Sequence, residues 1–90
     1  MIGKDPDLRQ KAQEAFINAE VAQLIYAARI DAKLTQKQLA ELIGTTQSVI
    51  ARLEDADYEG HSLSMLQRIA SALNKRIEIR FVPNPRRIAA

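Results

Sequence analysis

The stretch LIGTTQSVI, residues 42–50, decides the fold, because it interrupts one helical pattern of apolar residues and at once begins another. Gly44 lies where a helix would lose stability, and glycine readily adopts the left-handed conformation that closes a helix at its C-terminus. Thr46 follows two residues later, and a threonine hydroxyl can accept a hydrogen bond from the first turn of a helix. The stretch therefore predicts two short helices joined by a tight turn.

The residues on either side of this turn predict how the two helices pack. Thr35 is the expected N-cap of the first helix, and Ala40 is small enough for the two backbones to approach closely. The apolar positions predicted to face the core are Leu39, Ala40, Leu42, Ile43, Ile50 and Leu53. The polar side of the second helix carries Gln47, Ser48 and Arg52. Side chains of these kinds hydrogen-bond to base edges in the major groove of DNA.

Further helices are predicted before this pair. Asp5 and Pro6 favour the start of a short helix, since proline suits the first helical position. Asn18 is a possible cap for a second helix that runs to Ala32, and a single long helix is the alternative. The predicted core face of this helix is Val21, Leu24, Ile25 and Ala28.

One more helix is predicted after the pair. The loop EDADYEGH, residues 54–61, has little apolar content and is mostly acidic. Ser62 is the expected cap of the helix that follows, although Ser64 and Gln67 could instead form a capping box. Its predicted apolar stripe is Leu63, Leu66, Ile69, Ala70 and Leu73.

The period then changes in KRIEIRFVP, residues 75–83, where Ile77, Ile79 and Phe81 alternate with charged residues. This alternation predicts a half-buried strand. A lone strand leaves backbone groups unpaired, so we expect it to pair with the same strand of a second copy or with a sheet edge of another protein. The predicted organisation is a helical extension at 1–17, a helical domain at 18–74, a dimerising strand at 75–83 and a flexible basic tail at 84–90.

Composition excludes several classes of protein. With 90 residues and no cysteine, the chain is one small domain without disulfides or thiolate metal sites. The N-terminus does not resemble a signal peptide and no apolar run is long enough to span a bilayer, so we expect a cytoplasmic protein. The chain has one histidine and no glycine-rich phosphate loop, and its acidic run lacks the spacing of a calcium-binding loop. We therefore expect no catalytic activity, no cofactor and no metal.

The run LTQKQLAELIGTTQSVIARLE, residues 34–54, resembles the helix-turn-helix of lambda-repressor-like, or XRE-type, DNA-binding domains. The resemblance covers about residues 19–73 and implies an all-α fold of four or five helices. By position it implies base contacts from Gln47, Ser48 and Arg52, and a partly buried salt bridge between Arg29 and Glu54. The residues expected to contact phosphates are Thr35, Gln36, Thr46 and Ser62.

The C-terminal part of the chain resembles one particular group within this family. The run DYEGHSLSMLQRIASALNKRIEIRFVP, residues 57–83, together with the N-terminal extension, is similar to HigA-type antitoxins. This similarity implies a homodimer that represses its own operon at a palindromic site and neutralises a RelE/HigB-like ribonuclease toxin. A stand-alone regulator and a protein-binding inhibitor with weak DNA binding are the two alternatives. Since four acids lie between Glu54 and Glu59, we expect weak DNA binding by each monomer, strengthened by dimerisation or by a partner.

Overall fold

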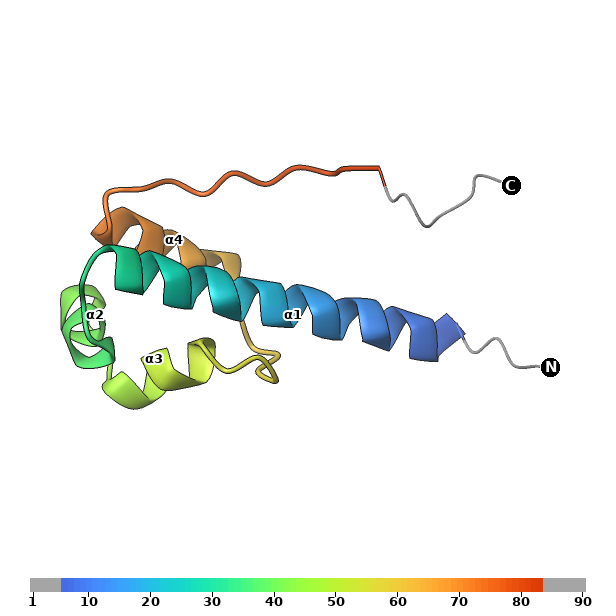
Figure 1. Ribbon diagram of the computed structural model, residues 1–90, viewed down its shortest axis with the longest axis horizontal. Coiled ribbons are helices and arrows are strands. Elements are labelled where there is room, and N and C mark those ends of the chain that lie inside the picture. The colour runs from blue at the N-terminus through green and yellow to red at the C-terminus, as the bar shows by residue number, and fades with distance from the viewer. Residues whose placement is uncertain (1–5, 84–90) are drawn as a thin grey trace.

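The computed structural model describes residues 6–83 and contains four α-helices (Figure 1). The helices are α1 (Pro6–Asp31), α2 (Gln36–Ile43), α3 (Gln47–Leu53) and α4 (Leu63–Ala72). The predicted all-helical domain is therefore confirmed, with four helices. The expected cap Asp5 and the basic tail at 84–90 lie outside the described residues.

α1 is one continuous helix of 26 residues, so of the two possibilities that the sequence left open at Asn18 the single long helix is correct. Asparagine lowers helix propensity by only a few tenths of a kcal/mol relative to its neighbours, far less than glycine or proline. Strong helix formers flank it in the run QEAFINAEVAQL, residues 13–24, so the helix continues. Pro6 does begin the helix, as predicted.

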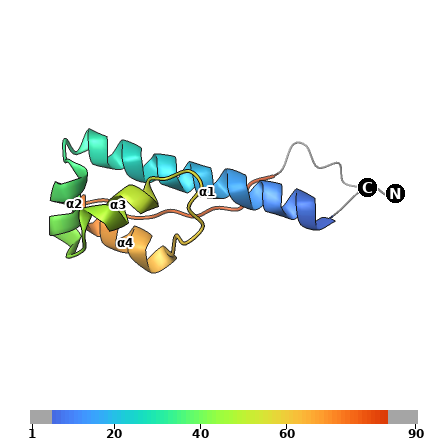
Figure 2. The ribbon, with the colours of Figure 1, turned by 90° about the horizontal axis from the view of Figure 1, so that it is seen from below.

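α2, α3 and α4 gather around the C-terminal half of α1, and the N-terminal half extends beyond them (Figures 1 and 2). One apolar core lies between the four helices, and Leu39 and Ile50 are fully buried at its centre. Partly buried side chains such as Val21, Tyr58 and Met65 pack around it. The buried apolar residues are Ala22, Ile25, Leu39, Ala40, Ile43, Ile50, Leu53 and Ile69.

Three leucines that were predicted to face the core are exposed instead: Leu24, Leu42 and Leu63. Each lies at the margin of an apolar stripe, where a rotation of one residue about the helix axis turns a side chain from the core to the solvent. In α1 the small side chain of Ala22 is buried instead, at 1% exposure. The periodicity of the sequence alone did not show that Ala22 is buried and Leu24 is exposed.

The helix ends follow the predicted signals. Gly44 closes α2 in the left-handed conformation, with φ of 75°, and its N–H donates to the carbonyls of Ala40 and Glu41. Thr35, Thr46 and Ser62 cap α2, α3 and α4, so Ser62 rather than Ser64 begins the last helix. These caps satisfy backbone N–H groups that would otherwise lack partners in the first helical turns.

Residues 75–83 form no strand in the described chain. After α4 they extend as a stretched segment toward the side of the molecule to which the N-terminal half of α1 projects (Figures 1 and 2). A strand is defined by hydrogen bonds to a neighbouring strand, and a single copy offers none among its described residues. Ile79 and Phe81 are accordingly exposed. In the part of the chain that is described, no helix is both long and apolar enough to cross a membrane.

Candidate nucleic-acid interface

α3 presents a polar face to the solvent while its other face is anchored in the core. Ile50 and Leu53 are buried, whereas Gln47, Ser48 and Arg52 are exposed. Ser48 and Arg52 are four residues apart and so lie on the same side of the helix, and Gln47 is exposed in its first turn. The anchored apolar positions therefore hold the polar side chains in a fixed orientation, which is what reading base edges requires.

Three capping hydroxyls stand at the beginnings of the short helices. The Thr35 oxygen accepts from the N–H of Gln38 at 3.0 Å, and the Ser62 oxygen accepts from the N–H of Met65 at 3.1 Å. The Thr46 oxygen accepts more weakly from the backbone of α3, at 3.4 Å. Each of these bonds uses the oxygen as an acceptor, which leaves the O–H group able to donate. Capping and phosphate contact are therefore compatible at all three residues.

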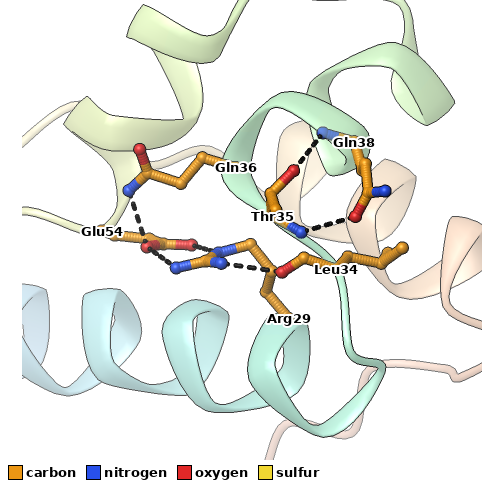
Figure 3. A network of polar contacts seen from close by, with 6 residues as sticks. All are labelled: Arg29, Leu34, Thr35, Gln36, Gln38 and Glu54. Carbon is orange, nitrogen blue, oxygen red and sulfur yellow. Dashed lines mark hydrogen bonds and ion pairs between the residues drawn. The ribbon is translucent and has the colours of Figure 1, made fainter.

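Arg29 and Glu54 form an ion pair that ties α1 to the end of α3 (Figure 3). Nε of Arg29 donates to Oε2 of Glu54 at 2.6 Å, and Nη2 donates to Oε1 at 3.0 Å. Nη1 donates to the carbonyl oxygen of Leu34 at 2.8 Å, so all three nitrogens of the guanidinium have partners. Arg29 is only 7% exposed and is the one buried charged residue among the described residues.

The hydrogen bonds that Arg29 donates to Glu54 raise the pKa of Arg29 above its ordinary value, against the opposing effect of burial. A folded-state pKa above the unfolded-state pKa means that the interaction stabilises the fold at every pH below the unfolded value. Its contribution is lost only as the pH rises into the strongly alkaline range. Tyr26 adds to this environment, since its ring centroid lies 5.3 Å from the guanidinium carbon of Arg29.

Gln36, the first residue of α2, joins the same network. Its Nε2 donates to Oε1 of Glu54 at 3.1 Å, and its side chain is partly buried (Figure 3). This bond fixes the side-chain amide at the beginning of α2, beside the capping box formed by Thr35 and Gln38. The amide nitrogen keeps a second N–H, which remains able to donate to a phosphate oxygen.

Two polar residues, Arg68 and His61, support this surface, although the sequence did not predict these contacts. Arg68 of α4 donates to the carbonyl oxygen of Ile43, at the end of α2 and next to the Gly44 turn. His61, which had no assigned role, donates from Nε2 to the carbonyl of Leu53 at 2.7 Å and so ties the loop to the end of α3. Neither contact leaves a signal in the sequence, because both acceptors are backbone carbonyls, which every residue possesses.

The acidic loop carries less free negative charge than its sequence suggests. Glu54 is paired with Arg29, so its charge is balanced inside the protein. Asp55, Asp57 and Glu59 are exposed, and the Asp55 side chain accepts from the N–H of Asp57 at 2.9 Å within the loop. Three exposed acids thus follow α3 directly in the chain.

Among the described residues no group of three or more histidine, cysteine or acidic side chains is arranged to hold a metal ion. A search of the curated proteins finds no match to the chain. A family model described as helix-turn-helix matches residues 25–79, which is more than half of the chain and includes α2, the Gly44 turn and α3. This family comprises DNA-binding regulatory domains rather than enzymes. The chain therefore belongs to the XRE-type helix-turn-helix family and is a DNA-binding transcriptional regulator.

Proposed function

We propose that the protein is a homodimeric, sequence-specific repressor that reads a palindromic operator through α3. The observation that carries the proposal is the exposed set Gln47, Ser48 and Arg52 on a helix whose opposite face is locked in the core. In the proposed complex these three side chains contact bases in the major groove. The phosphates on either side are contacted by Thr35, Gln36, Thr46 and Ser62.

Two copies are needed because a palindromic operator repeats the same half-site. To read successive major grooves, the two α3 helices must lie roughly 34–36 Å apart. We assign the pairing to the segment 75–83, with Ile77, Ile79 and Phe81 on the face that becomes buried. Its alternating pattern and its exposed apolar side chains support this assignment, since an antiparallel partner supplies the missing backbone hydrogen bonds.

The physiological role that we favour is that of an antitoxin, which represses its own operon and neutralises a RelE/HigB-like ribonuclease. The similarity of residues 57–83 to HigA-type antitoxins supports this role. Ribonucleases bind a polyanion and are commonly basic, and Asp55, Asp57 and Glu59 offer a complementary acidic surface. A shallow pocket lined by Glu14, Ile17, Asn18 and Glu59 adjoins this surface.

The decisive experiment measures binding to DNA from just upstream of the protein's own gene, by fluorescence anisotropy at about 150 mM salt. Replacing both Gln47 and Arg52 by alanine should weaken binding at least about 100-fold, because each base contact contributes about 1–3 kcal/mol in each half-site. The control variant, Gln23→Ala with Gln67→Ala, removes two polar side chains from exposed positions outside α3 and outside residues 8–17 and 75–83. Unchanged affinity in the first variant would refute the assignment of α3 as the reading helix.

A protein-binding module with weak DNA binding is the second candidate, favoured by the acidic loop after α3. The two candidates differ in their dependence on salt. A dimer that contacts about 6–10 phosphates should lose affinity by about 10³–10⁵ between roughly 50 and 200 mM salt. Binding that shows little preference over a scrambled duplex, together with tight inhibition of a ribonuclease encoded beside it, would favour the module.

A further inference from the structure

Two parts of the chain extend from the helical body and leave most of their side chains exposed. The first, here called the N-terminal arm, is residues 8–17 of α1, every one of which is exposed. The second, the C-terminal arm, is residues 75–83 after α4. Both arms extend in the same direction (Figures 1 and 2). The radius of gyration is accordingly 15.9 Å, against about 12 Å for a compact domain of this size.

Both arms carry large apolar side chains in open solvent. On the N-terminal arm Phe16 is 66% exposed and Ile17 is 55% exposed. On the C-terminal arm Ile79 is 64% exposed, and Phe81 is fully exposed at 104%. Single exposed apolar residues are ordinary, but several on one short segment are typical of a surface that contacts a partner.

The proposed pairing of C-terminal arms makes a two-stranded ribbon, and such a ribbon is only marginally stable by itself. Ile77, Ile79 and Phe81 lie on one face of it, because side chains alternate along a strand. That face needs an apolar cover. The body of the same chain does not supply one, since exposure rises along the arm from Ile77 at 36% to Phe81.

We infer that the N-terminal arm is this cover, and that it packs against the second copy of the chain so that two copies clasp each other. The inference rests on the proposed dimer and adds a second, helical component to its interface. In an antiparallel ribbon the partner's strand begins where this strand ends, near Phe81, so the partner's body lies at that far end. The N-terminal arm extends toward the same end (Figure 1), so in the proposed dimer this arm lies beside the partner.

The area available agrees with a stable dimer. Each large apolar side chain offers roughly 100 Å² for burial, and aromatic rings offer more. The C-terminal arm alone, with Ile77, Ile79, Phe81 and Val82, falls well short of the roughly 800 Å² per partner of a standard interface. Adding Leu8, Phe16 and Ile17 from the N-terminal arm brings the total close to that value.

The test is the dissociation constant of the dimer, measured by sedimentation over a range of concentrations, for the unaltered chain and three variants. Phe16→Glu alters the N-terminal arm and Ile79→Glu alters the C-terminal arm. Leu42→Glu is the matched control, because Leu42 is 58% exposed but lies on α2, at the opposite end of the molecule. We expect Phe16→Glu and Ile79→Glu each to raise the dissociation constant at least about 100-fold, since symmetry doubles every substitution. Leu42→Glu should leave it unchanged.

A second measurement keeps the test independent of any effect on folding. The natural chain has no cysteine, so a copy with Ile17→Cys mixed with a copy with Phe81→Cys should cross-link through a short bismaleimide. A copy with Leu42→Cys should not cross-link to Phe81→Cys. Circular dichroism of each variant confirms that the helices are intact.

Other outcomes would overturn the inference in distinguishable ways. Dissociation by Ile79→Glu but not by Phe16→Glu would leave the ribbon dimer standing and refute the cover. If the unaltered chain were a monomer at every concentration, both the ribbon dimer and the cover would be refuted. The role of α3 in reading DNA would still be tested separately, by operator binding. An intact Phe16→Glu dimer that no longer inhibits a ribonuclease would show that the N-terminal arm contacts the toxin instead of the second copy.

Discussion

Replacing Glu54 by leucine should destabilise the fold by about 3–5 kcal/mol, because Arg29 would keep its charge in the interior without a counter-ion. The side chains of Arg29 and Glu54 are only 9% and 5% exposed, so water cannot replace the lost partner. Two of the three guanidinium nitrogens would lose their acceptors, and only the Leu34 carbonyl would remain. A domain of this size has a total stability of only about 5–15 kcal/mol.

The converse variant, Arg29→Met, should cost a similar amount, since Glu54 would then be buried with only the Gln36 amide as a donor. Combining Arg29→Met with Glu54→Leu removes both charges and replaces them with apolar side chains. We expect the double variant to be more stable than either single variant, with a coupling energy of about 2–3 kcal/mol.

Urea unfolding followed by circular dichroism measures these differences, at one fixed protein concentration because dimerisation also stabilises the fold. Glu41→Gln is the control: Glu41 is an exposed acid on α2, so its replacement should change stability by less than about 0.5 kcal/mol. The reasoning is wrong if Glu54→Leu costs less than about 1 kcal/mol, as expected of a solvated pair. It is equally wrong if the two single effects simply add in the double variant.

Two backbone predictions and one packing prediction accompany this one. Gly44→Ala should destabilise the fold by about 1–2 kcal/mol, because φ is 75° there and alanine rarely adopts that conformation. Lys33→Gly, at φ of 62°, should stabilise the fold by up to about 1 kcal/mol for the same reason. Thermal unfolding should therefore show a lower midpoint for the first variant and a higher midpoint for the second, and midpoints that shift in the same direction would contradict the argument. Gly60→Ala should cost about 1–3 kcal/mol, because the new Cβ would clash with the hydroxyl group and ring of Tyr58, which must then move. Near-ultraviolet circular dichroism should change with it, and an unaltered tyrosine signal would contradict that displacement.

The turn and the capping residues were predictable from the sequence because their chemistry is local. Gly44 is needed for a left-handed backbone, and Thr35, Thr46 and Ser62 satisfy N–H groups three residues away. Such features depend on neighbouring residues alone. The buried apolar faces of α2 and α3 were predictable for the same reason, apart from Leu42 at the margin.

The sequence could not predict features that depend on how each helix is rotated about its axis or on contacts between residues far apart in the chain. The exposure of Leu24 and the burial of Ala22 reflect the rotation of α1, which neighbouring helices set. The bond from Gln36 to Glu54 joins residues 18 apart, and the bond from Arg68 to Ile43 joins residues 25 apart. The continuity of α1 through Asn18 was also undecided, because asparagine is tolerated in a helix and favoured at a cap.

The arms and the reading helix contribute to a single affinity in the proposed repressor. Asp55, Asp57 and Glu59 follow α3 and would repel phosphates in that complex, so we expect one half-site alone to bind weakly, in the range of about 10⁻⁴–10⁻⁶ M that is typical of non-specific binding. Two linked domains bind the second half-site at a high effective concentration, which strengthens binding by about 10²–10⁴. The same acids that weaken one domain thus make operator binding depend on the dimer. A partner that opened the arms would release the DNA without touching α3.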